Sequence, residues 1–122
     1  MNAEKLMVQC FSFIEVMTNL AKSGGPPWDA IAGAELVKHY KPDNEVYRSA
    51  PVFLGLKPEE VMMCAAHVPD LKAARTNGLR TGFISRPDEF GNGSAGVADK
   101  AKPGDFDVVS VSAVDLAMQM GA

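Results

Sequence analysis

Short apolar runs alternate with amphipathic segments along most of this 122-residue chain. Residues 61–66 (VMMCAA) and 80–85 (RTGFIS) have the length and apolar content of buried strands, and residues 68–79 between them place apolar side chains at helical spacing. The chain closes with a strand and then a helix over residues 106–120. Strands joined by helices of this length lie parallel through right-handed crossovers, so the alternation predicts an α/β fold whose parallel sheet is covered on both faces.

The first half of the chain follows the same pattern with stronger turn signals. Residues 6–13 suit a buried strand, although they could equally begin a helix, and residues 14–23 predict a helix that ends at the Gly-Gly-Pro-Pro sequence. A short strand is expected around Ile31. Pro42 disfavours helix at the residue before it. Lys41 is therefore expected on a loop just ahead of a helix over residues 43–56.

Length and composition limit the class of protein. With 47% hydrophobic residues, residues 1–122 are expected to form a single domain, in which residues 87–105, rich in Gly, Pro, Asp and Lys, form a long loop. A net charge of −3 with scattered Lys and Arg disfavours nucleic acid as a partner. No apolar run approaches the roughly 18 residues of a membrane span. The two cysteines have no spacing typical of disulfide frameworks or zinc sites, so neither is expected, and a reducing cytoplasm fits best.

Candidate site residues follow from the expected sheet. Ligands of open parallel sheets bind at the carboxyl ends of the strands, where helix N-termini present free N–H groups. His67 and Asp70 come directly after the strand predicted at residues 61–66, and Lys41 precedes another helix. Tyr47, one turn into that helix, can present its hydroxyl to the same space. These four residues are our predicted site.

Each of these residues also has a purely structural interpretation. Asp70 in the first turn of a helix can cap that helix or interact with its dipole without a catalytic role. A lysine before Pro-Asp, such as Lys41, is commonly a solvated loop charge, and a tyrosine at helical spacing, such as Tyr47, is commonly part of the core. The spacing alone leaves both interpretations open.

Two further patterns imitate functional motifs without their context. Residues 91–96 (GNGSAG) match Gly-x-Gly-x-x-Gly, but no apolar strand runs into them and no apolar helix follows, so dinucleotide binding is not expected. Residues 105–109 (DFDVV) imitate the Asp-x-Asp nucleophile loop of phosphatases. Their aspartates precede the predicted strand instead of following it, so we expect solvated turn residues.

Three segments carry a resemblance to a known family: residues 18–47 (TNLAKSGGPPWDAIAGAELVKHYKPDNEVY), 54–91 (LGLKPEEVMMCAAHVPDLKAARTNGLRTGFISRPDEFG) and 105–120 (DFDVVSVSAVDLAMQM). Their most specific parts are Lys-Pro-Asp with Val-Tyr, and the block that begins Ala-Ala-His-x-x-Asp-Leu-x-x-Ala-Arg. Through them the chain resembles the C-terminal part of haloacid dehalogenase superfamily proteins, specifically the type II (S)-2-haloacid dehalogenases.

The resemblance implies a Rossmann-like core with a helical cap and the hydrolysis of carbon–halide bonds in small-molecule 2-haloacids. In that mechanism an aspartate at the end of the first strand displaces halide from the α-carbon, and water hydrolyses the resulting ester. Covalent catalysis of this kind divides one difficult displacement into two easier steps. No metal or cofactor is implied for dehalogenation, unlike the phosphatase relatives, which use magnesium.

The resemblance also implies a role for each predicted site residue. Lys41 resembles the catalytic lysine that neutralises and orients the nucleophile and the substrate carboxylate, and Tyr47 resembles an active-site tyrosine beside it. Asp70 resembles the acidic residue that holds the lysine and positions the hydrolytic water. His67 falls where members have asparagine or histidine, which implies a substrate-binding role. Ala65 stands where several members have serine.

The chain departs from the family pattern in its first part. No Asp-x-x-x-Thr follows an N-terminal strand, and Cys10, Phe11 and Ser12 occupy the place of an expected Ser-Asn-Gly turn. We therefore expect an incomplete Rossmann-like, three-layer parallel sheet that lacks the first strand and the cap. A truncated hydrolase of this kind should show negligible turnover alone and should associate with itself or with a complementary fragment. The alternatives are a non-catalytic module that binds a partner and a magnesium-dependent phosphatase.

Overall fold

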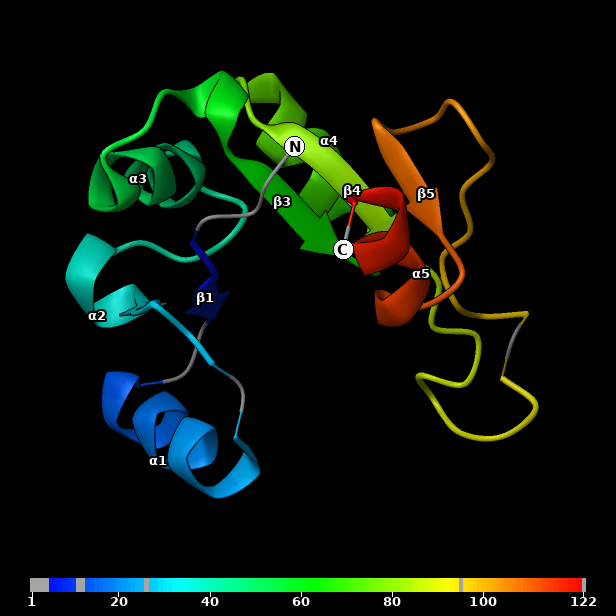
Figure 1. Cartoon of the computed structure of the whole chain (residues 1–122), viewed down its shortest axis with the longest axis horizontal. Helices are drawn as coiled ribbons and strands as arrows, with labels where there is room; N and C mark the ends of the chain where they lie inside the picture. The colour runs from blue at the N-terminus through cyan, green and yellow to red at the C-terminus, as the bar shows by residue number, and fades with distance from the viewer. Residues whose placement is uncertain (1–4, 11–12, 26, 95, 122) are drawn as a thin grey trace. The chain divides into compact units, whose positions relative to one another are not determined.

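The structure, a computed structural model, describes residues 5–10, 13–25, 27–94 and 96–121. Phe11 and Ser12, at the place of the expected Ser-Asn-Gly turn, lie outside the described residues. The chain divides into two compact units, an N-terminal unit (Ala3–Leu56) and a C-terminal unit (from Lys57 onward), and each is described by itself (Figure 1).

The N-terminal unit is built on a pair of parallel strands. β1 (Met7–Cys10) pairs with β2 (Ala30–Gly33) over the full length of both strands. α1 (Ile14–Gly24) connects them and ends at Gly25, whose φ of 78° lies in the left-handed region that glycine adopts without strain. The connection confirms the strand–helix–strand order predicted from the sequence.

Two helices follow β2 in the N-terminal unit, α2 (Ala34–Val37) and α3 (Asn44–Leu54). α3 supplies most of this unit's buried side chains: Val46, Tyr47, Ala50 and Pro51. Their spacing places them on one face of the helix. Pro51, which lacks an N–H and is unusual inside a helix, is therefore part of the face that the unit buries.

The C-terminal unit contains a three-stranded parallel sheet in the order β3–β4–β5. Its elements follow the predicted succession of a turn, a strand, a helix, a strand, a long connection, a strand and a helix. They are η1 (Pro58–Glu60), β3 (Met62–Ala65), α4 (Val68–Thr76), β4 (Arg80–Ile84), β5 (Val108–Ser110) and α5 (Ala113–Gln119).

The two helices of the C-terminal unit cover opposite faces of its sheet (Figure 1). Toward α4, Phe83 of β4 packs with Leu71 and Phe106, and the two phenylalanine rings stack with their centroids 6.2 Å apart. Toward α5, the β4 backbone at Gly82 is so close that a Cβ there would lie 3.4 Å from Leu116. This unit therefore has three layers, helix, sheet and helix.

Both strand ladders are parallel and are connected through helices, which confirms the predicted α/β, Rossmann-like fold class. The described residues between 87 and 105 form turns and bends. Because the two ladders lie in different units, a single domain over residues 1–122 stays a prediction. Among the described residues, every helix is too short or too polar to cross a membrane.

Candidate functional site

The four predicted site residues divide between the two units. Lys41 and Tyr47 lie in the N-terminal unit, whereas His67 and Asp70 lie in the C-terminal unit. The convergence of Lys41 with Asp70 therefore stays a prediction.

Lys41 lies on the loop between α2 and α3, as the position of Pro42 predicted. Its side chain is half-buried, and its ammonium lies 5.8 Å from the centroid of the Tyr47 ring. The quadrupole of an aromatic ring attracts a cation at such a distance. Tyr47 itself is fully buried, so it is part of the core and at the same time supports the lysine. Lys41 is thus held in place and is not a freely solvated loop charge.

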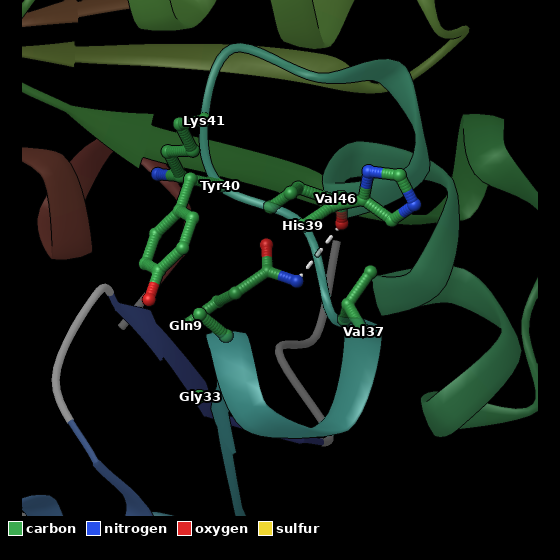
Figure 2. Close-up of a pocket in the computed structure, with 8 residues that line it drawn as sticks. Gln9, Gly33, Val37, His39, Tyr40, Lys41 and Val46 are labelled. Atoms are coloured by element: carbon green, nitrogen blue, oxygen red, sulfur yellow. Dashed lines mark hydrogen bonds between the residues drawn. The ribbon is translucent and has the colours of Figure 1, made fainter.

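Gln9 of β1 faces the same loop and is a residue that sequence reasoning missed (Figure 2). Its Nε2 donates hydrogen bonds to the Val46 carbonyl at 2.9 Å and to the Ser49 hydroxyl oxygen at 3.0 Å. These two bonds fix the orientation of the amide and tie β1 to the first turns of α3. The only sequence signal was one polar residue inside an apolar strand.

The amide oxygen of Gln9 borders a small cavity beside the Lys41 loop. This oxygen is buried and has no hydrogen-bond partner among the described residues. The cavity measures about 10 Å³ and is lined by Gln9, His39, Tyr40 and Lys41, among others (Figure 2). A cavity needs roughly 10–15 Å³ to hold one water molecule, and a buried acceptor requires a donor. The cavity is therefore sized for a single water and too small for an organic substrate.

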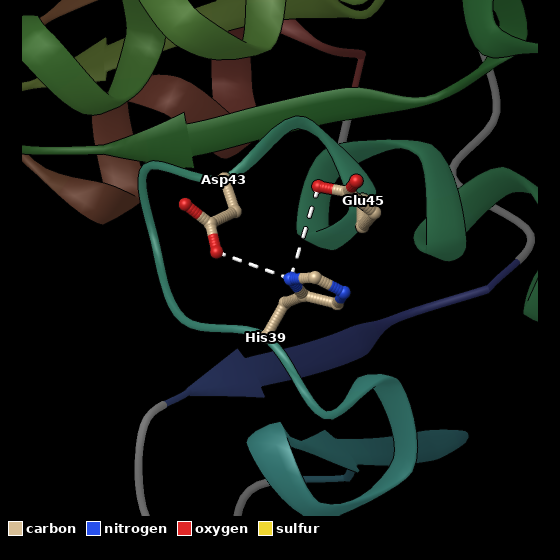
Figure 3. A group of neighbouring side chains, drawn as sticks. All are labelled: His39, Asp43 and Glu45. Carbon is tan, nitrogen blue, oxygen red and sulfur yellow. Dashed lines mark hydrogen bonds and ion pairs between the residues drawn. The ribbon is translucent and has the colours of Figure 1, made fainter.

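His39, Asp43 and Glu45 bring an imidazole and two carboxylates together in the N-terminal unit (Figure 3). His39 Nδ1 lies 3.1 Å from Asp43 Oδ2 and 3.9 Å from Glu45 Oε2. Within the part of the chain that the structure describes, this is the one group of side chains that can hold a metal ion. The side chains are 42%, 54% and 56% exposed, and hydrogen bonding between imidazole and carboxylate accounts for the arrangement. A site without metal remains our prediction.

His67 directly follows the end of β3, at the N-cap position of α4. Its Nε2 lies 2.8 Å from Glu89 Oε1, on the loop after β4. Glu89 is only 14% exposed, and Arg86 lies 3.8 Å from the same carboxylate oxygen. The carboxylate orients the imidazole, so Nδ1 is the ring nitrogen that this contact leaves for another partner.

Asp70 lies in the first turn of α4 and is half-buried. The helix N-terminus is held by a different carboxylate, because the Val68 N–H donates to Asp99 Oδ2 at 2.8 Å. Asp99 lies 31 residues away in the long loop and was not predicted. Asp99 thus shares the first turn of α4 with Asp70, whose carboxylate favours the helix dipole, and both interpretations of Asp70 stay open.

Asp105 and Asp107 are exposed bend residues ahead of β5, as predicted from the sequence. Asp107 has a further role that was not predicted, because its Oδ2 accepts hydrogen bonds from the Thr81 N–H at 2.8 Å and the Thr81 hydroxyl at 3.1 Å. Thr81 is fully buried in β4. Asp107 thus ties the start of β5 to β4, which is a structural role and disfavours a phosphatase nucleophile.

The Cys64 thiol shows a perturbed electrostatic environment. Desolvation by burial raises the pKa of this thiol, although much of the residue's surface is exposed. The two observations agree because Sγ would lie only 3.2 Å from a Cβ at Gly82, so the sulfur packs against the β4 backbone. A thiol with a raised pKa is protonated at neutral pH and is a poor nucleophile.

Three solved structures share this architecture. The L-2-haloacid dehalogenase PA0810 is 43% identical with a TM-score of 0.86, and the match covers 94% of this chain and 50% of that one. The defluorinating L-2-haloacid dehalogenase Rha0230 is 38% identical with a TM-score of 0.81, covering 92% and 45%. The L-2-haloacid dehalogenase from Xanthobacter autotrophicus, with chloropropionic acid covalently bound, shares the fold at 17% identity and a TM-score of 0.72, covering 89% and 51%. No family model and no curated protein matches the chain.

The chain therefore has a partial, Rossmann-type fold of the kind found in the haloacid dehalogenase superfamily. Its structural neighbours are specifically L-2-, that is (S)-2-, haloacid dehalogenases, which confirms the resemblance seen in the sequence. The chain spans about half the length of the dehalogenases it matches, which is consistent with the predicted likeness to their C-terminal part.

Proposed function

We propose that the chain contributes one side of a hydrolytic site for 2-haloacids. In this site Lys41 and Asp70 are catalytic, and Tyr47 and His67 line the substrate pocket. The observation that carries the proposal is 43% identity, over 94% of the chain, to an L-2-haloacid dehalogenase. The half-buried Lys41 ammonium, held over the Tyr47 ring, supports it independently.

The proposed reaction has two steps. A carboxylate attacks the α-carbon of the haloacid, the carbon–halogen bond breaks and the halide leaves. Water then hydrolyses the ester, which restores the carboxylate and yields a 2-hydroxyacid and a proton. Lys41 neutralises the substrate carboxylate and the attacking group, and Asp70 holds Lys41 and positions the water, a form of electrostatic preorganisation.

The attacking carboxylate comes from outside these 122 residues. No Asp-x-x-x-Thr follows an apolar strand in the sequence, and Asp107, the nearest imitation, is bound to Thr81. We therefore propose that the isolated polypeptide is inactive and that a complementary segment supplies the nucleophile. The proposed chemistry needs no metal and no oxidising compartment, in keeping with a cytoplasmic setting.

Halide release from (S)-2-chloropropionate tests the proposal. The purified chain is assayed alone and after mixing with the half of PA0810 that this chain does not match. We expect no release above background from the chain alone and measurable release from the mixture. In the mixture, Lys41→Met should abolish release, whereas Lys22→Met, which removes the same charge from an exposed position on α1, should leave it intact.

Two outcomes would contradict the proposal. Halide release by the chain alone would show that the nucleophile lies within it. Association of the two halves without halide release would instead favour the alternative, a non-catalytic module that binds a partner.

A further inference from the structure

A second candidate site lies in the C-terminal unit, and none of the proposed dehalogenase residues lines it. An open hollow of about 360 Å³ separates α4 from the loop over residues 99–106. Its lining consists of Val68, Lys72, Arg75, Lys100, Asp105 and Phe106. We infer that this hollow binds a compact small-molecule polyanion, one that carries two or more phosphate or carboxylate charges.

The hollow is preformed because the loop is fastened at both ends of α4. At one end the Val68 N–H donates to Asp99 Oδ2 at 2.8 Å, and at the other end Arg75 Nη2 donates to the Asp105 carbonyl at 2.7 Å. Val68, Lys72 and Arg75 follow one another at spacings of four and three, so they share one face of the helix. That face is the one covered by the loop.

Positive charge dominates the lining, with three cations and one carboxylate. The carboxylate of Asp105 is already engaged, since its Oδ2 accepts a hydrogen bond from the Lys102 N–H at 2.8 Å. Lys72 and Lys100 are exposed, and neither ammonium makes an ion pair or hydrogen bond with another described residue. A local excess of cations in a chain of net charge −3 creates a site that attracts anions.

Arg75 is oriented by its own contacts. Its guanidinium lies 5.1 Å from the centroid of the Phe106 ring, and Nη2 also lies 3.3 Å from the Thr81 hydroxyl oxygen. Phe106 beneath it is only 6% exposed, so the floor of the hollow offers little apolar surface to a ligand. Recognition therefore depends on charge.

The size and the charges define the ligand class. A volume of about 360 Å³ falls in the range of small-molecule pockets. A guanidinium matches the oxygens of phosphate and carboxylate groups, and lysine ammoniums act as point charges for the same groups. Lys72 lies on α4 and Lys100 lies on the facing loop. A ligand with two or more charged groups can therefore bind both ammonium groups at once.

Titration of the full chain with inorganic pyrophosphate and, separately, citrate tests the inference. Isothermal calorimetry at low ionic strength gives the affinity, and amide chemical shifts locate the ligand. We expect saturable binding at one site per chain, with shifts at Val68, Lys72 and Lys100. Binding of pyrophosphate alone identifies phosphate as the recognised group, and equal binding of citrate identifies polyanion charge in general.

Charge-removing variants assign the binding to the hollow. Lys72→Gln and Lys100→Gln should each weaken the affinity about five-fold, the effect of one unit charge near a ligand in water. Lys22→Gln, which makes the same change in net charge in the N-terminal unit, should leave the affinity unchanged. Circular dichroism checks that each variant remains folded. Failure of both anions to saturate up to about 10 mM, or equal weakening by Lys22→Gln, would overturn the inference.

Discussion

Replacement of Asp107 by alanine tests whether the hydrogen bonds of this carboxylate to Thr81 stabilise the pairing of β5 with β4. Its Oδ2 accepts hydrogen bonds from both the N–H and the hydroxyl of Thr81, a residue with no exposed surface. Alanine removes this acceptor from the Thr81 N–H and hydroxyl, and because Asp107 is itself exposed, water replaces part of the lost interaction. A hydrogen bond to a charged group contributes about 1.5–3 kcal/mol, and a buried donor without an acceptor costs about 1–3 kcal/mol. We therefore expect the free energy of unfolding to fall by about 1–3 kcal/mol.

Urea denaturation of the full chain measures this change. Asp88→Ala is the matched control, because it removes the same charge from an exposed loop position. Surface changes of this kind usually stay within about 0.5 kcal/mol of the parent. If Asp107→Ala unfolds at the same urea concentration as the parent, with an unchanged m-value, the proposed tie between β5 and β4 is refuted. Phosphatase activity that depends on Asp107 would refute it too.

Three further predictions concern packing, thiol chemistry and metal dependence. Gly82→Ala would place a Cβ 3.1 Å from Met62 Sδ and should lower the free energy of unfolding, measured by urea titration, by about 1–3 kcal/mol. Gly96→Ala, which has open space around it, should leave the free energy of unfolding unchanged. Equal effects of the two changes would contradict the close packing at Gly82. Burial raises the pKa of the Cys64 thiol, so alkylation by iodoacetamide at about pH 8 should be slower than for free cysteine, as followed by peptide mass mapping. The rate should rise as the pH is increased, and a rate equal to that of free cysteine at about pH 8 would contradict the burial of the thiol. EDTA should not change halide release by the complemented protein, and a loss that zinc or magnesium restores would show that the reaction needs a metal.

Much of the fold follows from local sequence signals. The apolar runs that became β3 and β4, and the helical spacing between them, depend only on neighbouring residues and were predicted at nearly their observed positions. The loop position of Lys41 followed from the steric effect of Pro42 alone. Local rules of this kind can be applied to a single sequence.

The interactions that sequence reasoning missed join residues far apart in the chain. Gln9 bonds a carbonyl 37 residues later, Asp99 holds a helix that begins 31 residues earlier, and Asp107 binds a threonine 26 residues before it. A carboxylate in a loop has no local feature that shows which N–H it will meet. The division into two units also depends on which strand edges pair, and composition does not determine that.

The central proposal is that Lys41 and Asp70 act together in one hydrolytic site. Treatment of the full chain with a carbodiimide, which joins an ammonium and a carboxylate in direct contact as an amide, measures this most directly. We expect a Lys41–Asp70 cross-linked peptide by mass spectrometry, and its loss in Asp70→Asn. Cross-links from Lys41 only to carboxylates of its own unit, such as Asp43, would contradict it.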